Sequence, residues 1–202
     1  MRLEVVLAAQ ARRQADKTAL ICGQQRLSYG QLAASVERLA QGLARCGLGV
    51  DERIALYLPN GIEVVQLLYA AFSLGAVAVP VTTRLALPEL AQHCQDSEAK
   101  ILAYHADQGP ALAEYLSARP DLATIVVGGD PSAENAIEKL MENAPVALLP
   151  PIPLEQEDCL INFTSGTTGR PKGAISTHAN IMVQHGFLNA LQWGLSADDR
   201  FL

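Results

Sequence analysis

A segment rich in hydroxyl groups, glycines and cations lies between residues 164 and 172. It follows an apolar run, Leu160 to Phe163, and reads Thr-Ser-Gly-Thr-Thr-Gly-Arg-Pro-Lys. Glycines let a backbone approach a ligand closely, and successive N–H groups with nearby hydroxyl donors can surround an anion. The lysine at 172 would add a positive charge against phosphate oxygens. The segment therefore predicts a polyphosphate-binding loop, and a plain Gly/Ser/Thr hairpin turn is the alternative that composition leaves open.

Two other phosphate motifs fail on spacing. A Walker A loop needs Gly-x4-Gly-Lys-Ser/Thr, and counting from Gly166 its second glycine would fall on Pro171. A Rossmann Gly-x-Gly-x-x-Gly begins at Gly47, but Glu52 occupies its last position. The glycines near 47 are better interpreted as the end of a helix and a turn.

The elements that must position this loop alternate between helical and strand patterns. Ser28 can cap a helix that ends at Gly47, and a second strong helical pattern covers residues 177–193 after the loop. Such alternation predicts an α/β fold with a mostly parallel sheet flanked by helices. In the helix after Ser28 the apolar positions Leu32, Val36, Leu39 and Leu43 recur at helical spacing. Apolar runs at 53–58, 76–81, 100–104 and 123–127 predict strands.

The organisation of the chain is that of one unit. Residues 143–157 carry four prolines and several acids, which predicts a surface connection within a domain. The longest apolar stretch, 67–81, is interrupted and shorter than the roughly 20 residues of a membrane helix, so no transmembrane segment is expected. The last residues look like a strand that is only beginning, and we expect the chain to be truncated at its C-terminus.

Charge and cysteine content argue against two classes of function, nucleic-acid binding and metal binding. The formal net charge is −6, and no dense basic cluster exists to displace counterions, so no nucleic-acid partner is expected. The four cysteines show no metal-ligand spacing and are interpreted as buried thiols of a cytoplasmic protein. His178 and His185 stand one heptad apart and are expected to share a helix face as packing or surface residues. His93 is interpreted as an ordinary helix residue, and no metal site is predicted.

The string from Thr164 to Gly173 resembles the signature phosphate loop of the superfamily of acyl-CoA synthetases, peptide-synthetase adenylation domains and firefly luciferase. Ten consecutive residues match, and Ser-Thr-His-Ala-Asn follows closely. Residues 27–32, 75–81 and 96–100 resemble further elements of this family. The Val-Pro-Val form at 79–81, with no aspartate behind it, favours CoA ligases over amino-acid-activating domains.

The resemblance implies that residues 1–202 are an incomplete N-terminal AMP-binding domain of an adenylate-forming enzyme. A carboxylate would attack the α-phosphate of Mg-ATP, giving an acyl-adenylate and pyrophosphate, and a thiol, typically that of coenzyme A, would take the acyl group. ATP, Mg²⁺ and coenzyme A are thus the implied cofactors, and a small-molecule carboxylic acid is the implied substrate. A non-catalytic nucleotide- or phosphate-binding module is the alternative.

The resemblance also assigns roles within the loop. Lys172 would place the pyrophosphate, and the other catalytic residues would lie beyond Leu202. The 202 residues alone are therefore expected to be inactive, and to self-associate through surface that the missing part would cover. The implied nucleotide-binding residues are Thr164, Ser165, Gly166, Thr167, Thr168, Gly169 and Lys172.

Overall fold

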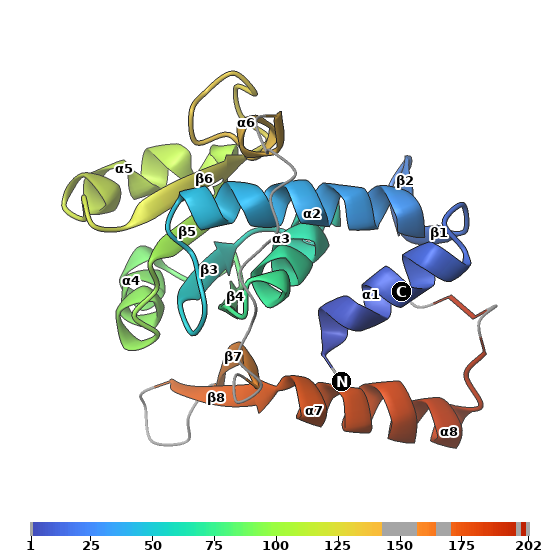
Figure 1. The fold of residues 1–202 in the computed structure, drawn as a ribbon. Coiled ribbons are helices and arrows are strands. Elements are labelled where there is room, and N and C mark those ends of the chain that lie inside the picture. The colour runs from blue at the N-terminus through green and yellow to red at the C-terminus, as the bar shows by residue number, and fades with distance from the viewer. Residues whose placement is uncertain (1, 143–156, 165–170, 197–198, 201–202) are drawn as a thin grey trace.

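A six-stranded sheet forms the centre of the protein, for which a computed structural model describes residues 2–142, 157–164, 171–196 and 199–200. The strand order is β6-β5-β3-β4-β7-β8. Every neighbouring pair is parallel except β7 with β8, so the predicted α/β fold with a mostly parallel sheet is confirmed. Figure 1 shows β8 at the rim, running directly into α7. The strands are β3 (Arg53–Tyr57), β4 (Val77–Val81), β5 (Ile101–His105), β6 (Ala123–Val127), β7 (Asp158–Thr164) and β8 (Lys172–Thr177).

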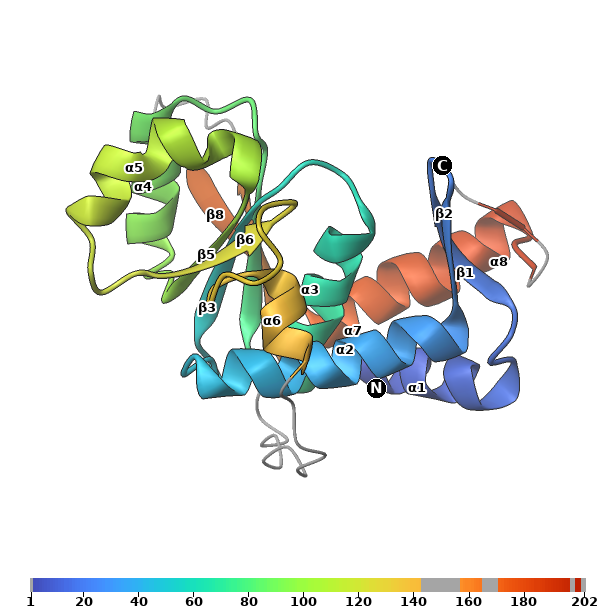
Figure 2. The ribbon, with the colours of Figure 1, turned by 90° about the horizontal axis from the view of Figure 1, so that it is seen from above.

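Helices cover both faces of the sheet and create two separate hydrophobic cores. Figure 2 shows α4 and α5 on one side and α2, α3 and α6 on the other. Parallel strands buried on both faces read as nearly continuous apolar runs, which explains why the strand patterns in the sequence were recognisable. The helices of the larger core are α1 (Leu3–Arg13), α2 (Tyr29–Arg45), α3 (Ile62–Ser73) and α6 (Ile137–Glu142), and those of the smaller one are α4 (Leu87–Asp96) and α5 (Gly109–Ser117), the latter after a short 3₁₀ turn η1 (Ala106–Gln108).

Local sequence sets both ends of the long helix α2. The Ser28 side chain accepts a hydrogen bond from the Gln31 backbone N–H, and the Gln31 side chain accepts one from the Ser28 N–H, which completes a capping box. Beyond the helix, Gly47 has φ of +84°, a conformation that favours glycine. The helix predicted from Ser28 to Gly47 is therefore confirmed.

A small antiparallel hairpin of β1 (Thr18–Cys22) and β2 (Gln25–Ser28) stands apart from the main sheet. One consequence concerns the cysteines, which were all expected to be buried. Cys94 and Cys159 are buried, but Cys46 is half-buried and Cys22 is exposed. The expectation was wrong for Cys22 because a two-stranded hairpin has no second layer to cover it.

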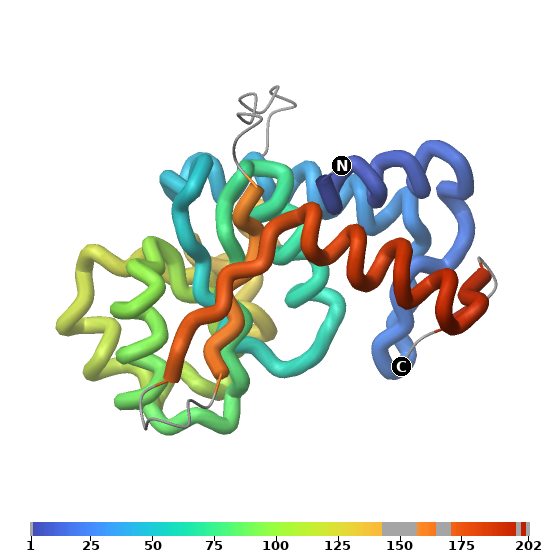
Figure 3. The backbone as a smooth tube through the Cα atoms, turned by 90° about the horizontal axis from the view of Figure 1, so that it is seen from below, coloured from blue at the N-terminus to red at the C-terminus, as the bar shows by residue number. Residues whose placement is uncertain are grey.

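The chain after β8 forms one continuous helical stretch that projects beyond the sheet (Figure 3). It consists of α7 (His178–Ile181), a π-helical part η2 (Met182–Asn189) and α8 (Ala190–Trp193), and ends at Gly194 with φ of +63°. The expectation that His178 and His185 share a face is wrong. A π-helix has more residues per turn than an α-helix, so seven residues no longer make two turns. His178 is fully buried, whereas His185 is exposed.

Two expectations concern parts of the chain that the structure does not cover. Most of the predicted surface connection, residues 143–156, and the last two residues, Phe201 and Leu202, lie outside the described residues. Within the described ranges, no helix combines the length and the apolar character needed to cross a membrane.

Candidate functional site

The two ends of the predicted phosphate loop meet at the tip of the β7–β8 hairpin. Phe163 lies opposite Gly173 in the strand register, and Thr164 lies opposite Lys172. The Thr164 hydroxyl donates to the Lys172 carbonyl over 3.4 Å, which makes it a weak contact. Because β7 runs parallel to β4, the chain leaves β7 at the carboxyl edge of the parallel strands. Ligands of open α/β sheets bind along this edge.

The predicted site residues divide into two groups. Thr164 and Lys172 are brought together as the first and last described positions around the loop, and both are exposed. Among the ion pairs of the described part, none involves Lys172, so its ammonium group faces solvent without a carboxylate partner there. The other predicted ligands, Ser165, Gly166, Thr167, Thr168 and Gly169, lie outside the described residues.

A close approach inside the hairpin explains why residue 173 is a glycine. A Cβ atom at this position would lie 2.9 Å from Cγ2 of Ile161 and 3.5 Å from two atoms of the Phe163 ring. Real Cβ atoms do not come within 2.9 Å of another heavy atom, so a side chain here would displace the Ile161 side chain across the hairpin. Because Gly173 has no side chain, the backbone of β8 can lie close to β7 directly after Lys172.

A histidine that the sequence analysis treated as an ordinary helix residue contacts this hairpin. The ring of His93, on α4, stacks on the ring of Phe163 with centroids 4.0 Å apart and planes inclined by 7°. Burial lowers the pKa of His93, while Glu89 and Asp96 on the same helix act in the opposite direction. Nothing local in the sequence signals this contact, because the two residues are 70 positions apart and meet only when α4 packs on the sheet.

Two hydrogen bonds join β7 and β8 at the end of the hairpin away from the loop. The His178 backbone N–H donates to the Glu157 carbonyl over 2.8 Å, and the Cys159 thiol donates to the Ser176 carbonyl over 3.3 Å. Burial raises the pKa of Cys159 to about 12, so this thiol remains protonated and unreactive near neutral pH. Cys159 is therefore a packing residue.

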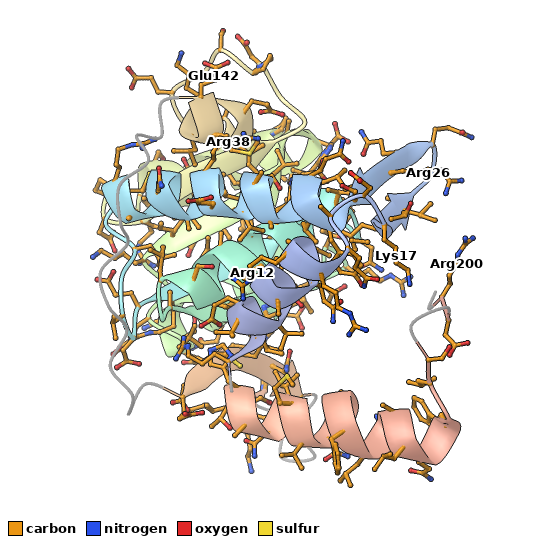
Figure 4. All side chains as sticks on the ribbon, turned by 45° about the vertical axis from the view of Figure 1, so that its right-hand side comes forward. Arg12, Lys17, Arg26, Arg38, Glu142 and Arg200 are labelled. Atoms are coloured by element: carbon orange, nitrogen blue, oxygen red, sulfur yellow. The ribbon has the colours of Figure 1, made fainter. Side chains whose placement is uncertain are left out.

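The basic side chains labelled in Figure 4 come from other parts of the molecule. Arg12, Arg26 and Arg38 belong to α1, β2 and α2, not to the β7–β8 hairpin. Within the described part of the chain, no three His, Cys, Asp or Glu side chains gather as a metal site would require. Among the described residues at the hairpin tip, Thr164 contributes a hydroxyl group and Lys172 an ammonium group.

These features define an α/β protein in which the predicted phosphate loop follows β7 at the carboxyl edge of a mostly parallel sheet. The chain belongs to the AMP-binding enzyme family, whose model matches residues 7–202. The resemblance drawn from residues 164–173 is therefore confirmed.

Its curated relatives are CoA ligases. The chain is 35% identical over 180 residues to the long-chain-fatty-acid–CoA ligase FadD13 of Mycobacterium tuberculosis, covering 87% of this chain and 33% of that protein. It is 33% identical over 194 residues to a feruloyl-CoA synthase of an Amycolatopsis species, covering 95% and 36%. The chain thus spans about a third of the length of these relatives.

Solved structures share the fold. A putative long-chain-fatty-acid CoA ligase from Rhodopseudomonas palustris matches with a TM-score of 0.87 at 27% identity, over 98% of this chain and 50% of that one. The N-terminal domain of FACL13 from Mycobacterium tuberculosis matches with a TM-score of 0.79 at 29% identity, over 99% and 49%. The architecture is accordingly that of the N-terminal domains of adenylate-forming ligases.

Proposed function

We propose that the whole protein carrying this sequence activates a carboxylic acid with ATP, as an acyl-adenylate, and then transfers the acyl group to the thiol of coenzyme A. The observation that carries the proposal is the family match over residues 7–202, which includes the hairpin that sets Thr164 beside Lys172. The relatives named above ligate a fatty acid and an aromatic acid to CoA. Their names support coenzyme A as the acceptor and a small organic acid as the substrate.

The proposed role of the hairpin is electrostatic. The Lys172 ammonium group would contact the β- and γ-phosphate oxygens, and the Thr164 hydroxyl would donate a hydrogen bond from the opposite strand. Cationic and hydrogen-bond donors aimed at phosphates stabilise the charge that the departing pyrophosphate acquires. Residues 165–169 would complete this set with hydroxyl and backbone donors.

Magnesium would enter the site with the nucleotide. Mg²⁺ is usually held by substrate phosphates with only one or two protein carboxylates, so it does not require an all-protein cage. This agrees with a hairpin tip whose described side chains are a hydroxyl and an ammonium group.

We further propose that residues 1–202 form one part of a larger AMP-binding domain, and that they do not complete the reaction alone. The relatives, roughly three times as long as the matched segment, support this division. All four cysteines are free, which agrees with a reducing cytoplasmic setting.

The test is carboxylate-dependent ATP–pyrophosphate exchange by the whole protein, with a panel of fatty and aromatic acids. Lys172→Ala should slow exchange about a hundredfold or more, the usual scale for removing a group that stabilises developing charge. Lys139→Ala removes an exposed lysine of α6 that pairs with Glu142, and serves as the charge-matched control with unchanged exchange.

A non-catalytic phosphate-binding module is the second candidate, since a loop of this composition could bind phosphate without chemistry. It predicts that Lys172→Ala weakens ATP binding in a protein that exchanges no pyrophosphate with any acid. Exchange that is present and insensitive to Lys172→Ala would instead remove this lysine from the proposed mechanism.

A further inference from the structure

His93 makes an aromatic contact with Phe163 of the β7–β8 hairpin, called the phosphate hairpin below because it carries the predicted phosphate loop. Its side chain is only 7% exposed, and its ring lies parallel to that of Phe163 at a centroid distance of 4.0 Å. Aromatic pairs in proteins are more often separated by about 4.5–7 Å, so this is a close, face-to-face contact. Phe163 is the next-to-last residue of β7, which ends at Thr164.

The nitrogens of the His93 ring do not explain its position. Neither Nδ1 nor Nε2 has a hydrogen-bond partner in the described part of the chain, although both are buried. Leaving a buried polar group unpaired destabilises the folded protein. A leucine would avoid that cost, so the feature of His93 that the structure uses is the flat face of the ring.

Phe163 transmits this contact to the strand that begins with Lys172. Its ring lies beside the backbone of Gly173, in the space that a side chain at 173 would enter. Gly173 is the register partner of Phe163 and the next residue after Lys172. The Phe163 ring, together with the Ile161 side chain 2.9 Å from that Cβ position, therefore forms the surface on which the start of β8 packs.

We propose that His93 is a positioning residue for the phosphate hairpin: by stacking on Phe163 it fixes the start of β8, and with it the backbone from which Lys172 reaches the nucleotide. The inference rests on the proposed function only in that Lys172 binds phosphate. It adds α4 to the elements that hold the site, although α4 contributes no ligand. Tightening or loosening this stack changes ATP affinity without changing the groups that touch ATP.

Three variants of the whole protein separate positioning from general stability. His93→Ala removes the ring, His93→Phe keeps a flat ring without nitrogens, and Leu90→Ala empties the same core one turn earlier on α4. An aromatic pair contributes about 0.5–1.5 kcal/mol, so His93→Ala should raise the KM for ATP about three- to tenfold. Its kcat at saturating ATP should stay near the wild-type value. His93→Phe should retain the wild-type KM, and Leu90→Ala should lower the melting temperature without raising KM.

A second measurement, the NMR amide resonances of the ligand-free protein, detects the stack of His93 on Phe163 in the absence of nucleotide. The Phe163 ring lies close to Gly173, its register partner and the residue after Lys172. If the ring reorients in His93→Ala, the amide resonances of Lys172 and Gly173 should both shift in the ligand-free protein. Leu90→Ala should leave them in place. If the whole protein exchanges no pyrophosphate with any acid, the proposed function fails, while these amide shifts still report the stack. The positioning role is overturned if His93→Ala moves neither the amides nor the KM, or if His93→Phe or Leu90→Ala weakens ATP binding as much as His93→Ala.

Discussion

The backbone N–H of Leu3 donates a hydrogen bond to Nδ1 of His178 over 3.3 Å, although the two residues are 175 positions apart. Because Nδ1 accepts, the ring is neutral and carries its hydrogen on Nε2. The ring is fully buried, and its centroid lies 5.3 Å from that of the Phe72 ring in a T-shaped arrangement. The first turn of α1 is thereby joined to His178, the first residue of α7, which directly follows β8.

This buried histidine should make stability depend on acid. Burial, assisted by the positive charges of Arg2 and the N-terminus, lowers the pKa of His178 to about 4 from its usual 6.5. Between these two values the unfolded chain binds the proton and the folded one does not, so acidification favours unfolding. The contribution of His178 is complete above about pH 6.5 and should be lost progressively down to about pH 4, by about 3 kcal/mol in total.

Urea unfolding of wild type and His178→Phe at pH 7 and pH 4.5 measures this effect. The variant should be less stable at pH 7, because the Leu3 N–H loses its acceptor. That difference should shrink at pH 4.5, since phenylalanine does not titrate. His93 titrates in both proteins and cancels from the comparison. A difference that stays constant with pH would contradict the assignment.

The hydrogen bond itself can be removed from its other side. Leu3 is the first residue of α1, where proline is well tolerated, and Arg2 before it is already extended. Leu3→Pro deletes the N–H, whereas Leu3→Ala keeps it and also truncates the leucine side chain. Leu3→Pro should be the less stable of the two by about 1 kcal/mol. In a His178→Phe background this gap should vanish or reverse, because proline removes the N–H that phenylalanine leaves without an acceptor. A gap of unchanged sign and size would point to the proline ring instead.

Two helical glycines should respond to alanine in opposite directions. A Cβ at Gly42 on α2 would lie 2.7 Å from the Leu140 carbonyl oxygen of α6, so Gly42→Ala should force these helices apart and destabilise the protein by about 1–3 kcal/mol. A Cβ at Gly186 meets only the flexible end of Met182, at 3.3 Å. Gly186→Ala should therefore stabilise the protein by about 0.5–1 kcal/mol through reduced chain entropy. Thermal unfolding of both variants checks the two signs.

The projecting helix should make the 202-residue chain associate with itself. Phe187, Leu191 and Trp193 on this helix expose 61%, 68% and 61% of their surfaces, and large apolar side chains exposed together favour association. Light scattering should show a mass that rises with concentration, and Leu191→Lys combined with Trp193→Lys should return it to that of a monomer. Gln192→Lys adds charge at an exposed polar position of the same helix and should not. A wild-type chain that stays monomeric at high concentration would refute the prediction.

The sequence was most informative where structure depends on neighbours in the chain. The Ser28 cap, the stop at Gly47 and the apolar strands of the parallel sheet all follow from local patterns, and the structure confirms them. The heptad argument for His178 and His185 failed because the helix between them is π-helical, which apolar periodicity does not reveal.

The site was only partly predictable for a similar reason. Glycine, hydroxyl and cationic residues within ten consecutive positions predict a phosphate loop, and the structure sets its ends, Thr164 and Lys172, opposite each other. Their contact with phosphate remains a prediction. The stack of His93 on Phe163 and the bond from Leu3 to His178 join distant segments. Such contacts exist only after the helices have packed on the sheet, and one sequence alone holds no trace of them.

The attachment of β7 to the sheet has a consequence for how the molecule assembles and opens. The β7–β8 hairpin is local, and hairpins of this kind form within microseconds. Its register against β4 pairs Ala78 with Leu160, roughly eighty positions apart, and closing so long a loop delays docking. The hairpin should therefore behave as its own cooperative unit, joining the sheet late and detaching from it at a lower free energy than β3, β4 and β5 require to separate. In native-state hydrogen exchange the amides of the hairpin should lose protection first, so the proposed phosphate site should come apart while most of the fold remains intact.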